Sequence, residues 1–193
     1  MGPPDVIRDE RDDATLIAQS LDDPQYFGAL FSRHAPSLHR YAARRLGSDL
    51  ADDIVAETFH LAFWKREGYD LARCDALPWL WRIATNLIRR HYRSEVRLYR
   101  ALVRTGVDPV LESHADMVAE RVSTAAGTSH LAAALAGLRK GDRDVLLLTA
   151  WGELSYQQVA DVLDIPVGTV RSRLNRARTK VRKVLGGVAD GRE

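Results

Sequence analysis

The sequence predicts an all-α protein of two small helical domains joined by a flexible linker, with a helix-turn-helix in the C-terminal domain. Apolar residues recur at steps of three and four along almost the whole chain, which is the period of an amphipathic helix. No stretch alternates polar and apolar residues as a strand would, and no hairpin turn signal is found. Near the C-terminus, a short helical pattern, a tight turn and a long basic helical pattern follow one another.

The domain boundaries follow from where this periodicity weakens. Residues 105–128 contain turn-forming stretches such as TGVDP and STAAGTS, and this segment exceeds the about 4–6 residues that usually connect elements within a domain. We therefore predict a linker there. The predicted segments are an arm and first helix at 1–22, a first domain at 23–104, the linker at 105–128, a second domain at 129–185 and a tail at 186–193.

The charge of the chain is balanced overall but uneven locally. The formal net charge is +2, yet the segment from Arg82 to Arg104 and the C-terminal helix are strongly basic. Cys74 is the only cysteine, which excludes an internal disulfide and a zinc site of several cysteines, and leaves a redox role for that thiol open. No apolar run approaches the roughly 18 residues of a membrane span, and the N-terminus lacks the apolar core of a signal peptide. We expect a soluble cytoplasmic protein.

The first helical stretch is predicted over residues 13–46. Pro36 is expected to kink or break it, because proline has no N–H to donate. Gly47 is expected to end this stretch, since glycine is the preferred residue after a helix. Ser48 or Asp49 is then expected to cap the next helix.

The second helical stretch, which ends at residue 67, has an apolar side and an acidic face. Asp53, Glu57 and His60 share the acidic face, and Glu57-x-x-His60 is half of the pattern used by di-iron helical bundles. The sequence holds no second Glu-x-x-His copy. A solvated face is therefore the default interpretation, and a docking face for a partner is the alternative.

The third stretch, one long helix predicted over 77–102, mixes aromatic and basic residues and follows the loop GYDLARCDA at 68–76. Aromatic rings stack on unpaired bases while arginines hold phosphates, so this helix suits single-stranded DNA, and the loop could wall a pocket for a flipped base. Taken alone, the helix fits better a buried apolar side with solvated arginines. The residues concerned are Trp79, Trp81, Tyr92, Tyr99, Arg82, Arg89, Arg90, Arg93 and Arg97.

The C-terminal stretch has the layout of a helix-turn-helix, whose second helix enters the major groove of DNA. Ser155 is expected to cap a short helix, YQQVADVLD, which the turn DIPV connects to a second helix, GTVRSRLNRARTKVRKVL. Residues at helical spacing along that second helix are expected to form a buried stripe. They are Val170, Leu174, Ala177, Val181 and Leu185.

The other side of the second helix carries side chains suited to reading DNA. Arg171, Asn175 and Arg178 share one face, and arginine and asparagine bond guanine and adenine bidentately. Thr169, near the helix start, suits a phosphate contact. The alternative, a basic helix lying on anionic lipid, is disfavoured by the short helix and tight turn before it. The predicted DNA-contacting residues are Thr169, Arg171, Ser172, Asn175, Arg176 and Arg178.

From about residue 26 to residue 185, the order of these parts resembles the extracytoplasmic-function (ECF) group of bacterial RNA polymerase sigma factors. The motifs that carry the resemblance are YFGALFSRHAPSLHRYAARRLG, ADDIVAETFHLAFW, PWLWRIATNLIRRHYR and, most specific, LSYQQVADVLDIPVGTVRSRLNRARTKVRKVL. The resemblance implies a factor without cofactor or catalysis of its own that directs core polymerase to promoters and helps to melt the −10 region. Two departures, LRKG at 138–141 in place of a Leu-Pro pair and Gln158 in place of the common glutamate, bear on fine packing and polymerase flap contacts.

The resemblance also implies a partner for each surface. Residues expected to dock on the β′ clamp helices, with Phe59 exposed, are Asp52, Asp53, Ile54, Glu57, Thr58 and Phe59. Residues expected to engage the −10 element, together with the loop at 68–76, are Trp81, Asn86, Arg89, Arg90 and Arg93. The C-terminal domain would read the −35 element and contact the β flap. An anti-sigma factor would occlude these faces on both domains.

Two other classes of protein stay as alternatives. A stand-alone helix-turn-helix regulator, such as a response regulator, would need an α/β receiver domain, and the N-terminal half shows no strands. A helical metal-dependent hydrolase would need more convergent ligands than Asp53, Glu57 and His60.

Overall fold

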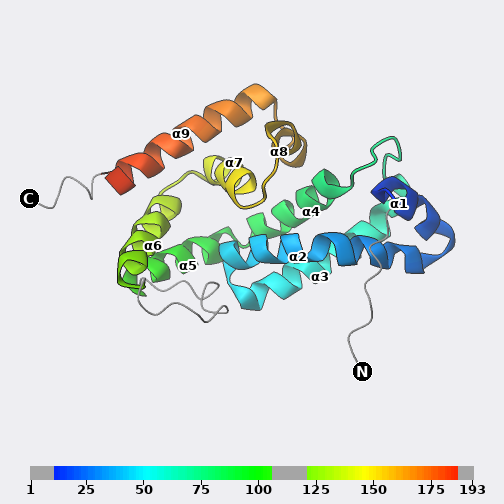
Figure 1. The fold of residues 1–193 in the computed structure, drawn as a ribbon, viewed down its shortest axis with the longest axis horizontal. Helices are drawn as coiled ribbons and strands as arrows, with labels where there is room; N and C mark the ends of the chain where they lie inside the picture. The colour runs from blue at the N-terminus through cyan, green and yellow to red at the C-terminus, as the bar shows by residue number, and fades with distance from the viewer. Residues whose placement is uncertain (1–10, 106–120, 187–193) are drawn as a thin grey trace, which may run out of the picture.

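The computed structural model describes residues 11–105 and 121–186, and every regular element in this part of the chain is helical (Figure 1). The predicted all-α class is confirmed. The N-terminal arm before residue 11, most of the predicted linker and the tail after residue 186 lie outside the described residues. The α-helices are α1 (Asp13–Asp22), α2 (Phe27–Leu46), α3 (Ser48–Lys65), α4 (Leu77–Arg90), α5 (Tyr92–Thr105), α6 (Arg121–Ala136), α7 (Lys140–Ala150), α8 (Tyr156–Leu163) and α9 (Val167–Gly186), with 3-10 turns at Pro24–Tyr26 and Arg66–Gly68.

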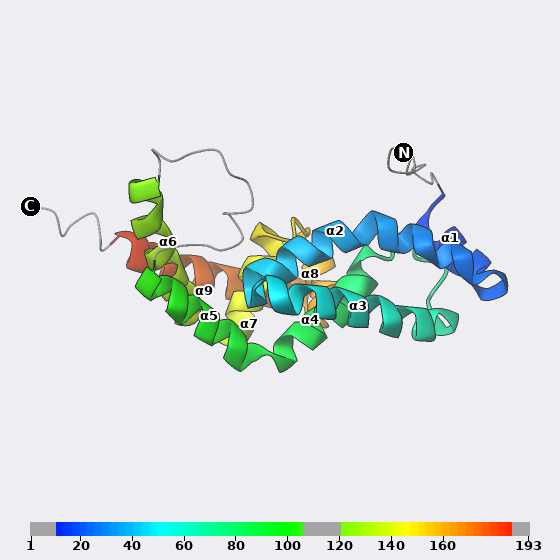
Figure 2. The same ribbon diagram turned by 90° about the horizontal axis from the view of Figure 1, so that it is seen from below.

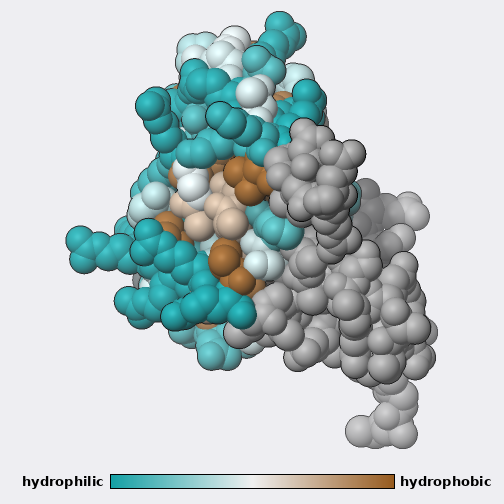
Figure 3. All heavy atoms as spheres, turned by 90° about the vertical axis from the view of Figure 1, so that its left-hand side faces the viewer, coloured by the Kyte–Doolittle hydropathy of each residue, from teal (hydrophilic) through white to brown (hydrophobic). Residues whose placement is uncertain are grey.

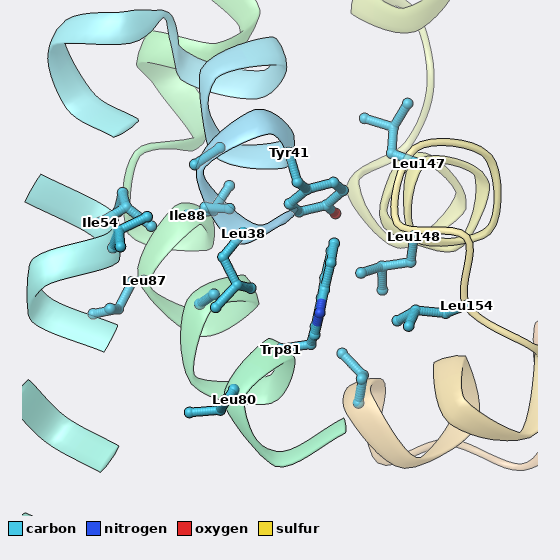
Figure 4. Close-up of a cluster of buried hydrophobic side chains, with 14 of the residues drawn as sticks. Leu38, Tyr41, Ile54, Leu80, Trp81, Leu87, Ile88, Leu147, Leu148 and Leu154 are labelled. Carbon is cyan, nitrogen blue, oxygen red and sulfur yellow. The ribbon is translucent and has the colours of Figure 1, made fainter. Parts of the chain in front are cut away.

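The first domain is organised around α2, α3 and α4. Helix α2 packs along α3, and α4 packs against both. Their buried side chains meet in one core, where each fully buried aliphatic residue contributes about 1.5–3 kcal/mol relative to exposure. Those drawn in Figure 4 are Leu38 and Tyr41 of α2, Ile54 of α3, and Leu80, Trp81, Leu87 and Ile88 of α4.

A single glycine joins α2 to α3. Gly47 adopts φ = 92°, a conformation that strains other residues, and its N–H donates to the carbonyl of Ala43 at 2.8 Å. Its predicted role at the end of α2 is confirmed. The predicted caps Ser48 and Asp49 are wrong, because α3 already begins at Ser48 and Gly47 itself occupies the cap position.

Helix α2 continues through Pro36, where a kink or break was expected. The proline removes the donor that would bond the carbonyl of Ser32, four residues earlier. Both residues are exposed, so water can hydrate that carbonyl and the helix need not end.

The long helix predicted over 77–102 is two helices. His91 leaves the helical conformation (φ = −91°, ψ = 18°), its N–H bonds the carbonyl of Ile88, and α5 starts at Tyr92. Neither glycine nor proline marks this break in the sequence. It turns α5 away from the axis of α4, and the buried Glu95 on α5 lies just past it.

The second domain, α6 to α9, packs directly on the first. Helix α6 begins at Arg121, inside the predicted linker, and lies against α5, while α8 lies against α4. Figures 1 and 2 show α1 and α6 at opposite ends of the molecule, with the domain contact between them. No helix in the two described ranges is long and apolar enough to cross a membrane.

Candidate nucleic-acid interface

The helix-turn-helix is built by local hydrogen bonds that the sequence encodes. Ser155 accepts the N–H of Gln158 at 3.2 Å, and the Gln158 side chain accepts the N–H of Ser155 at 2.9 Å, which completes a capping box at the start of α8. The predicted cap is confirmed, and glutamine serves in this box as glutamate does. Asp164 adopts the left-handed conformation (φ = 54°) that ends α8 before the turn to α9.

Helix α9 buries most of its predicted stripe. Val170, Leu174 and Ala177 are buried and Val181 is half-buried, but Leu185 is exposed, which corrects the prediction for that position. Leu185 lies in the last turn of α9, the helix that packs against α6, and α6 in turn packs against α5. Figure 3 views the left-hand side of Figure 1 and shows apolar side chains gathered between hydrophilic ones.

The predicted base-reading residues share the open side of α9. Arg171, Ser172, Asn175 and Arg178 are exposed, and Thr169 is half-buried. Their side chains are therefore open to solvent or to a partner. The Ser172 hydroxyl, however, donates to the carbonyl of Thr169 at 3.0 Å.

Arg176 differs from its neighbours because it has a partner inside its own domain. Its Nη2 lies 2.9 Å from Oδ1 of Asp142 on α7, although the side chain is 55% exposed. The hydrogen bond and charge of Asp142 raise the pKa of Arg176. A base contact by Arg176 would have to compete with this ion pair.

The predicted −10 residues lie on α4 and α5, and two of them are engaged by the second domain. Trp81 is 1% exposed, meets the ring of Tyr41 edge-on at 4.7 Å, and lies beside Leu148 and Leu154 (Figure 4). Arg89 pairs with Asp144 of α7 at 2.9 Å.

The other three predicted −10 residues remain on the surface. Asn86 and Arg93 are exposed, and the exposed Arg90 lies 3.4 Å from Glu57 of α3. The structure thus divides the predicted set into a covered pair, Trp81 and Arg89, and an accessible group.

The indole N–H of Trp81 is left without a hydrogen bond in this position, within the described part of the chain. Its indole nitrogen is buried and meets no hydrogen-bond partner among the described residues. A buried donor without an acceptor destabilises by about 1–3 kcal/mol. Packing of the second domain on α4 therefore leaves the indole N–H of Trp81 without a hydrogen bond to any residue of the described ranges.

A buried network of charges, which we call the interdomain ion network, joins the two domains. Arg45 of α2 bonds Glu95 of α5 at 2.6 Å and Asp144 of α7 at 2.8 Å. Arg143 of α7 bonds Glu95 at 3.0 Å, and Arg89 completes the network through Asp144. Sequence analysis missed it, although Glu95 is the only acidic residue from position 77 to position 104.

The loop at 68–76, which we call the pocket loop, does line a cavity. The cavity has a volume of about 650 Å³ and lies between the pocket loop and the start of α4. The rings of Tyr69 and Trp79, which both line the cavity, pack together with their centroids 4.9 Å apart. Arg82 forms another part of the wall and donates from Nε to the carbonyl of Asp161 on α8 at 3.1 Å, so the second domain closes one side.

The predicted docking set on α3 splits by burial. Asp52, Asp53 and Glu57 are exposed, whereas Ile54, Thr58 and Phe59 are buried. The expectation of an exposed Phe59 is wrong, because its ring is 6% exposed and packs edge-on against Phe27 and Phe31.

Sequence analysis missed the exposed aromatic residue on this face. Trp64 is 70% exposed and continues the helical spacing of Asp53, Glu57 and His60, whose ring it meets at 6.2 Å. Among the described residues, no three His, Cys, Asp or Glu side chains are grouped to hold a metal ion. The acidic face thus presents carboxylates followed by an indole.

The fold and these surfaces together are typical of a helical DNA-binding transcription factor, with a helix-turn-helix in one domain and aromatic and basic side chains on the helices of the other. Residues 30–98 match the family Sigma-70 region 2, and residues 130–181 match the family Sigma-70, region 4. The chain belongs to the ECF group of RNA polymerase sigma factors. Like its family, it directs RNA polymerase to promoters.

Several curated relatives extend over nearly the whole chain. The RNA polymerase sigma factor CnrH of Cupriavidus metallidurans is 33% identical, over 90% of this chain and 94% of the relative. The ECF sigma factor EcfG of Rhodopseudomonas palustris is 33% identical, over 82% and 83%. The sigma factor NccH of Alcaligenes xylosoxydans xylosoxydans is 31% identical, over 90% and 94%.

Solved structures share the fold. CnrH in complex with the cytosolic domain of CnrY superposes with a TM-score of 0.66 at 28% identity, over 91% of this chain and 97% of that one. The sigma factor RpoE from Bartonella quintana, solved with the anti-sigma factor NepR, gives a TM-score of 0.59 at 20% identity, over 83% and 96%.

Proposed function

We propose that this sigma factor reads the −35 element with α9 and the −10 element with α4 and the pocket loop, and docks on core polymerase through α3. The observation that carries the proposal is the open face of α9, where Arg171, Asn175 and Arg178 are exposed while the apolar stripe of the same helix is buried. Side chains of these types discriminate bases in the major groove. The cavity beside Tyr69 and Trp79 supports capture of an unpaired base at the other end of the promoter.

Docking on polymerase is assigned to the exposed acidic face of α3. Asp52, Asp53 and Glu57 offer carboxylates to a basic surface, and Trp64 adds a large apolar contact of the kind that dominates interfaces. The resemblance to ECF factors makes the β′ clamp helices the partner of this face and the β flap a partner of the second domain. Such a factor acts in the cytoplasm, where the polymerase is.

Binding the −10 element requires the two domains to separate. Trp81 is buried against the second domain, so it cannot contact DNA while the domains pack together, and Arg89 would have to break its ion pair with Asp144 to do so. Opening would expose both residues and free the indole N–H of Trp81 to find an acceptor. An anti-sigma factor that binds both domains would hold the closed arrangement.

The proposal is tested first by binding to core RNA polymerase in gel filtration. The protein with Asp53→Ala and Glu57→Ala is compared with wild type and with Asp22→Ala, an exposed carboxylate on α1 that serves as the matched control. Phe59 is left unchanged because it belongs to the core. Co-elution that weakens only in the α3 variant is expected, whereas a folded wild type that never co-elutes would favour a stand-alone regulator.

A further inference from the structure

The first helix, α1, contacts the pocket loop through one buried carboxylate. Asp13 begins α1 and is 3% exposed. Its Oδ2 accepts the backbone N–H of Ala76 at 2.9 Å and lies 2.8 Å from Nε2 of His34. Its Oδ1 accepts a hydrogen bond from Arg33. Two side chains of α2 thus aim the carboxylate at the end of the pocket loop.

The backbone of Asp13 makes a second bond to the same loop. Its N–H donates to the carbonyl of Cys74 at 3.1 Å, so Asp13 bonds the chain on both sides of Asp75. Buried hydrogen bonds of this kind are strengthened by the low local dielectric. The pocket loop is therefore fixed immediately before Leu77, where α4 begins.

This attachment lies behind the wall of the cavity. Cys74 and Asp75 of the pocket loop and Trp79 and Arg82 of α4 all line the cavity. The two Asp13 bonds hold Cys74 and Ala76 against α1 and, through His34 and Arg33, against α2. They therefore fix the part of the cavity wall that the pocket loop supplies. Asp13 itself is not among the residues that line the cavity.

We propose that Asp13 is a positioning residue for promoter melting, which holds the pocket loop at the width that an unpaired base requires. Helix α1 thereby belongs to the machinery that opens DNA, although it lies outside the cavity. The inference rests on the proposed role of the pocket loop in capturing a −10 base.

The loop can be observed directly through Cys74, the only cysteine of the chain and an exposed one. A nitroxide attached to this thiol reports the motion of the loop by electron paramagnetic resonance. Asp13→Ala is expected to increase its mobility, and Asp13→Asn to have a smaller effect because an amide oxygen can still accept the Ala76 N–H. The matched control is Asp12→Ala. It removes a side-chain hydrogen bond at the same end of α1, the 2.7 Å bond from the Thr15 N–H to Asp12, but it removes no bond to the pocket loop.

The consequence for function is measured with reconstituted holoenzyme on a promoter selected with the wild-type protein. Permanganate reactivity of unpaired thymines reports melting. Asp13→Ala is expected to slow open-complex formation on the order of tenfold, as the loss of about one positioned hydrogen bond predicts. Affinity for core polymerase and for −35 duplex should stay at the wild-type value, and Asp13→Asn should restore part of the rate.

The outcomes separate this inference from the function on which it rests. Equal label mobility in the Asp13→Ala and Asp12→Ala proteins would overturn the anchoring role. A mobile loop with a wild-type melting rate would overturn the role in melting, while the proposed function would stand. Failure of wild-type holoenzyme to melt any selected promoter would contradict the proposed function itself. If Asp13→Ala does not fold by circular dichroism, Asp13→Asn carries the same comparisons.

Discussion

At the residue scale, the stability of the fold should depend on the single carboxylate of Glu95, because it pairs with two buried arginines. It is 1% exposed and bonds both Arg45 and Arg143, each of which is also buried. Replacing Glu95 with alanine leaves two guanidinium groups short of a partner, and breaking a buried pair in this way costs about 3–5 kcal/mol. Urea denaturation should show this loss. Glu57→Ala, which removes the exposed pair with Arg90, should cost about 0–1 kcal/mol, and equal losses would contradict the assignment.

Also at the residue scale, Arg171 and Arg182 of α9 should behave differently although both are exposed. Arg171→Ala is expected to cost about 1–3 kcal/mol on the cognate −35 duplex and to relax specificity at one base pair. Arg182→Ala, near the end of the helix, should weaken binding equally on all sequences and reduce the salt dependence. Fluorescence anisotropy with cognate and substituted duplexes distinguishes the two. A uniform loss for Arg171→Ala would make it a phosphate contact.

At the element scale, the attachment of α1 to α2 should depend on pH through Asp13. Burial by itself would raise the pKa of Asp13, but hydrogen bonds from His34, Ala76 and Arg33 outweigh it and lower the pKa below its ordinary value. A carboxylate with a lowered folded-state pKa stabilises the fold above its ordinary pKa, and this stability is lost as pH falls through the folded-state value. The free energy of unfolding should therefore fall below about pH 4, and less so in Asp13→Asn. Parallel pH curves for the two proteins would contradict this.

The same scale shows what local sequence can and cannot predict. The capping box at Ser155 and the turn at Gly47 depend on neighbouring residues, and both were predictable from the sequence. The break at His91 has no signal in the neighbouring sequence. The contact that accompanies it joins Glu95 to Arg45, fifty residues earlier in the chain, and local sequence does not show such a contact. Phe59 was misplaced for a related reason, since the rings that bury it come from another helix.

At the scale of the whole molecule, the covered −10 face is a property of the domain contact rather than of either domain. The positions of Trp81 and Arg89 on α4 are evident from helical spacing, but their burial depends on α7 and on Leu154. Helical periodicity identifies the faces of a helix without showing which partner covers them. The surface of α9 was easier to predict, because Arg171, Asn175 and Arg178 are exposed and the apolar stripe packs against helices of its own domain.

Asp144→Asn should shift the molecule from the closed to the open arrangement. Asp144 is 0% exposed and pairs with Arg45 and Arg89 of the first domain. A neutral asparagine removes one of the negative charges that compensate the buried Arg45, and opening of the domains would let water hydrate that guanidinium group. Small-angle X-ray scattering should show a larger radius of gyration, and the free protein should bind single-stranded −10 DNA more tightly. The matched control is Asp142→Asn, on the same helix, whose partner Arg176 lies in its own domain. If both variants keep the wild-type radius and affinity, the interdomain ion network does not hold the domains together.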